Sequence, residues 1–380
     1  LATAALADTT VAPRAVDRGV GPIAATPMLA ETERADTPLA NFYQAMVLTT
    51  PAGLTRGQLD RILTALLDRH GMLRARLSRT GSGWALDVPA TGTDHAPAVT
   101  EGPLGPDDVD AATTRAAAEL APEDGVMLRA VWQDEPGGTG RLLLVVHHLV
   151  IDGVSWRILG EDLARAWADV AANREVALDD VPTSFRTWSH AIAATSFAAE
   201  TPFWNDVLTT PDPDLGDRPL DPAVDIASTV VTQRISLPDE VSAALLGAVP
   251  AAFHGGVNDV LLTALALALS RWRADRGRSA GTAALLNVEG HGRENELVSA
   301  DLDLSRTVGW FTSIYPVRVD PGALAWSDVL AAGPELATAA KAVKEQLRAV
   351  PSRGIGYGVL RYLDPTRPLP GAAPQILFNY

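Results

Sequence analysis

The spacing of hydrophobic positions predicts several amphipathic helices. Across residues 58–70, leucine and isoleucine recur every three or four positions and so share one helical face. Thr55 and Gln58 form the pattern of a capping box, and Gly71 follows where the chain should leave the helix. The same periodicity predicts further helices after residue 152 (with Ile158, Leu159, Leu163 and Trp167 on one face), over residues 258–271 with Asn258 as N-cap, and over residues 331–350 facing solvent.

Short apolar runs between these helices predict β-strands. They lie at residues 73–77, 141–148, 283–289, 313–319 and 375–380. Strands alternate with helices in both halves of the chain, which indicates an α/β or α+β fold. A chain of 380 residues exceeds one typical core and fits two lobes. A polar stretch at residues 171–182 marks the expected boundary, giving lobes at 21–180 and 181–380 after a linker or tail at 1–20.

Composition excludes several classes of function. A formal net charge of −15 argues against nucleic-acid binding, which needs clustered cationic surface. No apolar run approaches the roughly 20 residues of a membrane span, and no signal-peptide pattern opens the chain, so a cytoplasmic location is expected. Cysteine is absent, which removes thiolate chemistry. The only lysines, Lys341 and Lys344, lie in a predicted surface helix, which disfavours a pyridoxal phosphate enzyme.

Two adjacent histidines close the predicted strand at 141–148. Asp152 and Gly153 follow them and lead into the next helix, an order typical of a presented base with an orienting carboxylate. Successive strand residues point to opposite faces, so if the strand continues through the pair we expect one of His147 and His148 to be packed and the other to be presented. The alternative is a satisfied pair of core histidines beside a helix N-terminus.

A second charged cluster follows the predicted strand at 283–289. Glu289, His291 and Arg293 alternate with two glycines, which allow a tight turn that aims charged groups at one point. At the edge of buried space, desolvation should raise the pKa of Glu289 unless Arg293 holds the carboxylate ionised. The alternative is a solvated turn whose surface ion pair contributes little.

Three further segments combine glycine or asparagine with aromatic residues. They are TVGWFT at 307–312, GIGYG at 354–358 and FNY at 378–380, and each alone is typical of a turn or a strand end. The glycines at 354–358 do not form a phosphate loop, because no Lys-Ser/Thr pair follows them.

The chain resembles the condensation-domain superfamily of nonribosomal peptide synthetases through its HHxxxDG motif. It resembles the epimerization branch of that superfamily through five further matches in this order: VSW, EGHGRE, TVGWFT, GIGYG and FNY. The resemblance implies two chloramphenicol acetyltransferase-like lobes forming a V-shaped pseudo-dimer with a central channel. It extends more faintly to Thr26-Pro27 and Tyr43-Gln44. Met28-Leu29 stands where the family usually has glutamine and an aromatic pair, which puts substrate or carrier contacts there in doubt. Relatives usually continue beyond the position of Tyr380, so an incomplete second lobe is expected.

The resemblance also implies an activity and its residues. The activity is L-to-D epimerization of an aminoacyl or peptidyl thioester on the phosphopantetheine arm of a peptidyl carrier protein, without a cofactor or metal bound by the domain itself. His148 and Glu289 would flank the α-carbon, and Asn379 and Tyr380 would serve the enolate or a proton relay. The implied supporting residues are His147, Asp152 paired with Arg293, Gly153 and Trp156, and the implied channel residues are Trp310, Phe311 and Tyr357. The implied partners are an upstream carrier and a downstream condensation domain.

Three alternatives stay open on the sequence. An amide-forming condensation domain would use His148 similarly. A non-catalytic recruitment module would have the same fold and only bind a partner enzyme. A metal site of His147, His148 and Asp152 is disfavoured because adjacent histidines rarely converge on one ion.

Overall fold

The computed structural model describes residues 18–81, 83–92, 98–221, 223–278, 281–364, 366, 369–371 and 374–380. The linker expected at residues 1–20 therefore lies almost entirely outside the described residues. The chain forms two compact units, the first made of residues 1–195 with 295–311 and the second of 196–294 with 312–380. Strands and helices occur in both, and the predicted mixed fold class is confirmed.

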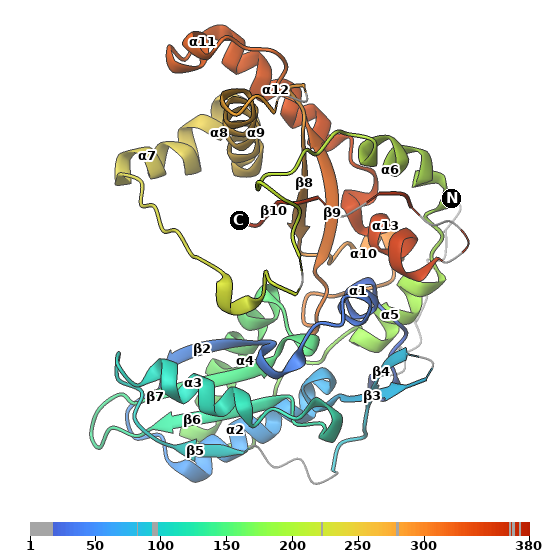
Figure 1. Cartoon of the computed structure of the whole chain (residues 1–380). Coiled ribbons are helices and arrows are strands. Elements are labelled where there is room, and N and C mark those ends of the chain that lie inside the picture. The colour runs from blue at the N-terminus through green and yellow to red at the C-terminus, as the bar shows by residue number, and fades with distance from the viewer. Residues whose placement is uncertain are drawn as a thin grey trace, which may run out of the picture. The chain divides into compact units, whose positions relative to one another are not determined.

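Unit 1 is built on a four-stranded sheet in the order β2-β7-β6-β5 (Figure 1). Its central strand β7 has six consecutive buried residues because both of its faces are covered. Leu143 and Val145 pack against α3, while Leu142 faces α2 and α4 on the other side. The strands are β2 (Tyr43–Thr49), β5 (Val99–Glu101), β6 (Leu128–Gln133) and β7 (Arg141–His147), and the helices are α2 (Arg56–Arg69), α3 (Val109–Ala118) and α4 (Gly153–Ala171).

A smaller antiparallel sheet and three further helices complete unit 1. The sheet has the order β1-β4-β3, with β1 at Gly21–Pro22, β3 at Arg76–Thr80 and β4 at Gly83–Val88. The helices are α1 (Pro27–Arg34), α5 (Phe185–Ala194) and the single turn α10 (Asn295–Val298). Thr26 caps α1 by accepting a hydrogen bond from Leu29 N, and Pro27 occupies its first position.

The predicted helix at 58–70 is confirmed as α2, and so is its capping box. Thr55 accepts from the backbone of Gln58, and the Gln58 side chain accepts from the backbone of Thr55.

The prediction of a strand at residues 73–77 is wrong at its start. Gly71–Arg74 forms a 3-10 turn, because the His70 and Met72 carbonyls take the following backbone donors, and β3 begins only at Arg76.

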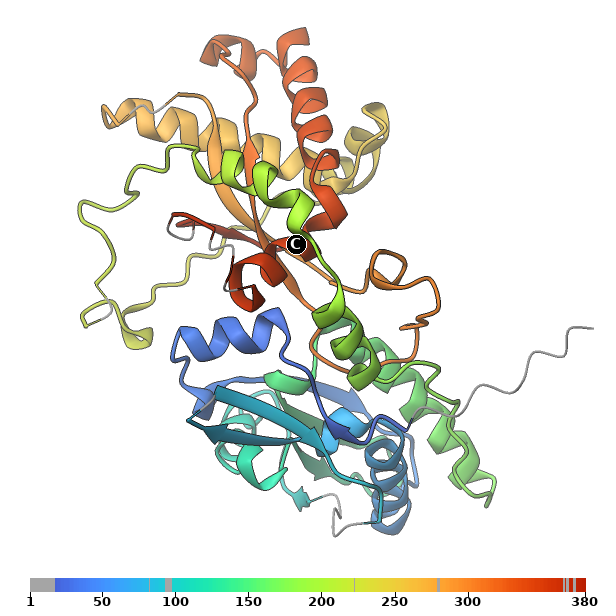
Figure 2. The same cartoon turned by 90° about the vertical axis from the view of Figure 1, so that its right-hand side faces the viewer.

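Unit 2 is built on the three-stranded sheet β10-β8-β9 (Figure 2). Helices α9 and α12 cover one face of this sheet, where Leu262, Ala266 and Val343 pack against Leu286 and Val317. The strands are β8 (Ala284–Gly290), β9 (Ser313–Val319) and β10 (Leu377–Phe378). The helices are α6 (Thr201–Leu208), α7 (Asp239–Ala243), α8 (Val249–Ala252), α9 (Val257–Asp275), α11 (Trp326–Leu330), α12 (Pro334–Arg348) and α13 (Ile355–Gly358).

Three details of unit 2 differ from the sequence prediction. The N-cap of α9 is Gly256, whose N–H donates to Asp259, and not Asn258. The helix predicted at 331–350 does not simply face solvent, because Val343 is buried in the core, and the Lys344 ammonium donates to Phe253 O. The strand predicted at 375–380 forms only at Leu377–Phe378.

The chain between α6 and α7 is long and largely irregular in both views (Figures 1 and 2). Its described part holds one 3-10 turn, Ala227–Thr229, and several strongly exposed apolar side chains. Leu220, Val231 and Ile235 are each more than 80% exposed. Within the described residues no single helix is both long and apolar enough to cross a membrane; Asp239–Ala252 and Val257–Asp275 meet both conditions only as a pair, with a 103° bend between them.

The boundary between the units differs from the predicted one at 180/181. The first crossing lies at 195/196, and residues 295–311 return to unit 1. The returning segment is held by Thr183, whose hydroxyl accepts from Asp303 N and whose carbonyl accepts from the Thr307 hydroxyl. Arg306 is bonded to the buried carboxylate of Asp162 on α4. Such long-range bonds have no local sequence signal, so the two-part composition of unit 1 was not predicted.

Candidate active site

The two adjacent histidines lie where β7 ends and the chain turns into α4. The side chain of His147 is buried and accepts a hydrogen bond from Leu149 N at 3.3 Å. Burial lowers the pKa of His147 to about 4, so this imidazole is neutral at physiological pH. His148 lies one residue beyond the strand, in the 3-10 turn His148–Val150, and is half-buried. The pair is thus one packed and one partly accessible imidazole.

Both ring nitrogens of His148 have polar neighbours. Nδ1 lies 2.9 Å from the carbonyl oxygen of Ile151, and Nε2 lies 3.1 Å from Nε2 of Gln44 on β2. The Oε1 atom of Gln44 in turn accepts from the indole N–H of Trp156 at 2.7 Å. Strand pairing places Gln44 here, because β2 and β7 run antiparallel with Tyr43 opposite His147.

Two aromatic rings pack against the His148 imidazole. Phe42 stacks on it at 5.0 Å between centroids with 19° between the planes, and the backbone N–H of His148 donates to Phe42 O at 2.9 Å. Trp310 packs against it at 4.8 Å. Burial among these groups desolvates the imidazole and lowers the pKa of His148. Backbone hydrogen bonds and the charge of Asp152 oppose this lowering to a smaller extent. His148 is therefore held neutral in a fixed orientation.

Asp152 acts as an N-cap. Its Oδ1 accepts from Ser155 N at 2.7 Å in the first turn of α4, and its Oδ2 accepts from Phe311 N at 3.1 Å. The carboxylate is buried and joins two segments that are far apart in sequence. Its predicted partner Arg293 belongs to unit 2, so that pairing stays a prediction.

The segment 307–311 lies against the first turn of α4. Gly309 N donates to the Ser155 hydroxyl at 3.1 Å. A Cβ at Gly309 would lie 2.2 Å from the Phe185 ring, so only glycine permits this approach. Phe311, predicted to line a channel, is buried and packs on Phe185 and Trp188 within unit 1, so its role in a channel stays a prediction.

In unit 2, Glu289 and Asn379 lie together. The Asn379 amide donates to the Glu289 carboxylate at 2.8 Å. This contact follows from the parallel pairing of β10 with β8, which sets Phe378 beside Val288 and brings the next residue of each strand to the same end. Tyr380, predicted beside Asn379 as an enolate or relay group, is 68% exposed.

The turn after Glu289 is stabilised by bonds of its own. The His291 Nδ1 accepts from Arg293 N at 3.0 Å, and Glu294 forms an ion pair with Arg353 at 2.7 Å. The glycine-rich segment 354–358 follows Arg353 and packs on β9. Gly354 has a φ of +82°, and a Cβ there would lie 2.1 Å from the Tyr315 ring. Tyr357 in this segment was also predicted to line a channel. Its backbone lies in the short helix α13, and its buried ring packs on Trp204 with 5.2 Å between the ring centroids.

Sequence reasoning found most of the polar groups but missed three residues around His148. Gln44 lies on β2, 104 residues before His148, and Phe42 directly precedes that strand. Ser155 supplies a hydroxyl that Asp152 and Gly309 share. Only the faint motif match at Tyr43-Gln44 pointed to this strand. His148 and Glu289 belong to different units, so their convergence on one substrate stays a prediction.

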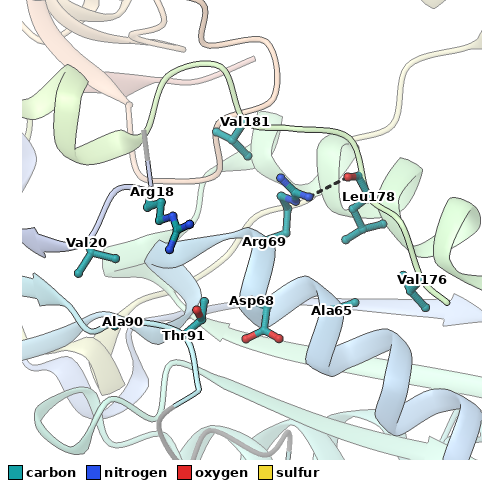
Figure 3. Close-up of a pocket in the computed structure, with 10 residues that line it drawn as sticks. All are labelled: Arg18, Val20, Ala65, Asp68, Arg69, Ala90, Thr91, Val176, Leu178 and Val181. Atoms are coloured by element: carbon teal, nitrogen blue, oxygen red, sulfur yellow. Dashed lines mark hydrogen bonds between the residues drawn. The ribbon is translucent and has the colours of Figure 1, made fainter. Parts of the chain in front are cut away.

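Unit 1 also has a cavity of about 420 Å³ at the C-terminal end of α2 (Figure 3). The ten residues that line it include none of the predicted site residues. Arg69 at its wall donates to the Leu178 carbonyl and the Asp180 carboxylate, so it stabilises the chain after α4. Within the described residues, no three histidine, aspartate or glutamate side chains are placed to share a metal ion.

Comparison with known proteins gives consistent results. A model of the condensation-domain family matches residues 33–370. The chain is 36% identical over 366 residues to a linear gramicidin synthase protein of Brevibacillus parabrevis, and 36% identical over 360 residues to chondramide synthase cmdD of Chondromyces crocatus. Each match covers 90% of this chain but only 7% and 8% of the respective relative, so the chain corresponds to a small part of these proteins.

Solved structures show the same fold. The epimerization domain from the third module of tyrocidine synthetase B superposes with a TM-score of 0.77 at 28% identity, covering 96% of this chain and 82% of that structure. The first condensation domain of the calcium-dependent antibiotic synthetase superposes with a TM-score of 0.66 at 17% identity, covering 95% and 79%. The second similarity, at this low identity, concerns the fold alone.

Proposed function

The chain belongs to the condensation-domain family of nonribosomal peptide synthetases, and from that premise we propose that it is an epimerization domain. Its substrate would be an aminoacyl or peptidyl thioester on the phosphopantetheine arm of a carrier protein, and its product the epimer at the α-carbon. The observation that carries this proposal is a neutral, aromatic-clamped His148 in the family's histidine motif, in a chain that also has the EGHGRE turn with Glu289.

The comparisons support this choice within the family. The match to an epimerization domain has both higher identity and higher TM-score than the match to a condensation domain. The motifs at 289–294 and 354–358 resemble the epimerization branch rather than the condensing one.

The proposed reaction is proton removal from the α-carbon and proton return from the opposite face. A thioester carbonyl acidifies the α-proton, and the C–H electron pair passes into an enolate. One of His148 and Glu289 takes the proton, and the other, in its protonated form, gives one to the opposite face. Exchange with solvent then restores both groups, so no redox partner or second substrate is needed. Cysteine chemistry cannot contribute, because the chain has none.

The other proposed groups serve geometry and charge. Asn379 donates its amide N–H to the Glu289 carboxylate and so orients this group. Tyr380, with its exposed phenol, would hydrogen-bond the enolate oxygen when substrate is bound. The proposed partners are the carrier that presents the thioester and a condensation domain that takes the epimer onward.

The test uses a carrier protein loaded with an L-aminoacyl thioester in deuterated water. The released amino acid is analysed by chiral chromatography and mass spectrometry after incubation with the domain. We expect a D/L mixture with one deuterium at the α-carbon of the inverted product. An unchanged L-amino acid without deuterium, with a folded domain and several different loaded residues, would overturn the proposal.

Condensation is the second candidate, since the fold and the His148 motif are shared with condensation domains. Adding a second carrier loaded with an acceptor amino acid separates the two. Formation of a dipeptide on that carrier, without α-deuteration, would assign the chain to the condensing branch.

A further inference from the structure

A chain of hydrogen bonds runs through His148. It begins at the Trp156 indole, passes through the side-chain amide of Gln44 to Nε2 of His148, and ends from Nδ1 at the Ile151 carbonyl. The three contacts measure 2.7, 3.1 and 2.9 Å. All of these residues belong to unit 1.

The chemistry of the two ends determines where each proton lies. An indole N–H can only donate, so the atom of Gln44 facing Trp156 is the carbonyl oxygen. The amide NH₂ of Gln44 then faces His148, and Nε2 of the imidazole must accept. At the other end the Ile151 carbonyl can only accept, so Nδ1 of His148 carries the proton. Both ends of the chain thus specify the same tautomer.

We propose that Gln44, oriented by Trp156, is a positioning residue that holds His148 as the neutral Nδ1–H tautomer, with an unprotonated Nε2 that accepts from the Gln44 amide. This tautomer has its basic lone pair on the nitrogen farther from the backbone. The role deepens the proposed function, because a base that removes an α-proton needs an unprotonated nitrogen, and the Gln44 N–H gives way at Nε2 when that proton is taken. The tautomer assignment itself holds for any reaction in which His148 acts as a base.

Protonation of Nε2 would bring two donors face to face. The Gln44 amide can relieve this only by turning over, and its NH₂ would then oppose the Trp156 indole N–H. The chain therefore disfavours the imidazolium and favours fast release of an accepted proton. The side chains packed on the ring are Phe42, Gln44 and Trp310, and none of them titrates. Two titratable groups lie close by. The oxygens of Asp152 accept from Ser155 and Phe311, and His147 is neutral.

The first test is the imidazole ¹⁵N spectrum of histidine-labelled protein at neutral pH, with His148 assigned by its loss in His148→Asn. We expect a pyridine-type Nε2 and a pyrrole-type Nδ1. Trp156→Phe releases the amide of Gln44, so we expect a mixed tautomer and an apparent pKa that moves up toward the roughly 6.5 of an ordinary histidine. Trp84→Phe, on β4, is the matched control and should leave the His148 signals unchanged.

The second test is Gln44→Glu, which replaces an amide by a carboxylate of the same shape. The carboxylate accepts from Trp156 and from a protonated Nε2, so His148 should be protonated at pH 7 and its pKa raised. If His148 is the base, turnover at pH 7 should fall at least about 10-fold and the acid limb of the pH profile should move to higher pH. Gln58→Glu is the control, since glutamate serves a capping box equally well.

The outcomes separate this inference from the proposed function. An Nε2–H tautomer in the parent protein, or unchanged spectra in both Trp156→Phe and Gln44→Glu, overturns the role of Gln44 whatever the reaction. The expected spectra together with a protein that never epimerizes would uphold the tautomer and overturn the proposed function instead. Melting temperatures of the two variants close to that of the parent exclude simple misfolding as the cause.

Discussion

At the residue scale, burial gives neighbouring imidazoles different roles. His147 is 1% exposed and sits among apolar side chains, while His148 keeps an accessible edge and polar neighbours on both nitrogens. Burial disfavours the charged form in both, which lowers both pKa values. A buried neutral histidine also links folding to pH, because the unfolded chain takes up a proton more readily than the folded one.

This linkage predicts an acid-sensitive stability. His147 stays unprotonated down to about pH 4 in the folded protein, whereas a histidine in the unfolded chain becomes protonated below about pH 6.5. Stability is therefore fully present above pH 6.5 and falls as the pH drops toward 4, by on the order of 3 kcal/mol for this residue. His147→Asn should flatten the decline measured by urea unfolding between pH 7 and 4.5. His254→Asn, at an exposed histidine, should not change the slope, and an equal slope in both variants would refute the assignment.

At the element scale, Asp152 joins α4 to the segment that carries Trp310. Asp152→Ala removes an N-cap and leaves the buried Phe311 N–H without this acceptor, so we expect a loss of about 2–4 kcal/mol in unfolding free energy. Asp152→Asn retains one carboxamide oxygen and should lose less. Denaturant unfolding of the parent and both variants measures this. An unfolding midpoint of Asp152→Ala equal to that of the parent would contradict the structural role.

The two kinds of apolar residue in unit 2 should respond differently to truncation. Leu286 is fully buried in β8, and Leu286→Ala should cost roughly 2–5 kcal/mol through lost burial and a new cavity. Ile235 lies in the irregular chain before α7 and is 84% exposed, so Ile235→Ala should change stability by less than about 0.5 kcal/mol. Chemical unfolding of both variants makes the comparison. A substantial loss in Ile235→Ala would show that this segment is packed in solution.

At the scale of the whole molecule, the proposed reaction depends on one group from each unit. His148→Gln and Glu289→Gln should each lower α-deuterium incorporation at least about 100-fold, because each removes one acid–base group. The double variant should be little worse than either single one, since groups that act together are not additive. The assay is deuterium incorporation into the loaded carrier.

Controls for these two variants lie on the surface. His254→Asn and Glu296→Gln change an exposed histidine and an exposed glutamate, and both should keep near-parental exchange. Melting temperatures of all four single variants should stay close to the parent value. Near-normal exchange in His148→Gln or in Glu289→Gln would remove that residue from the mechanism.

The sequence by itself determined the features that depend on local chemistry. Periodicity identified α2, β7, β8 and β9, because an amphipathic helix and a buried strand each have a short-range pattern. Thr55 and Gln58 marked a helix start, since a capping box lies within four residues. The prediction of one packed and one presented histidine agrees with the structure, although β7 ends at His147 and His148 lies in the following 3-10 turn, so strand alternation is not the reason. The ordered motifs pointed to the condensation-domain family.

Only the tertiary structure decided which distant residues meet. Gln44 reaches His148 through the pairing of β2 with β7, Phe42 stacks on it from the residue just before β2, and Asn379 reaches Glu289 through the parallel β10–β8 pair. The return of residues 295–311 to unit 1 rests on bonds to Thr183 and Asp162. Register and long-range bonds are set by the free energy of the whole packed fold, so no local pattern specifies them. The protonation state proposed for His148 depends on such contacts between residues that are far apart in the sequence.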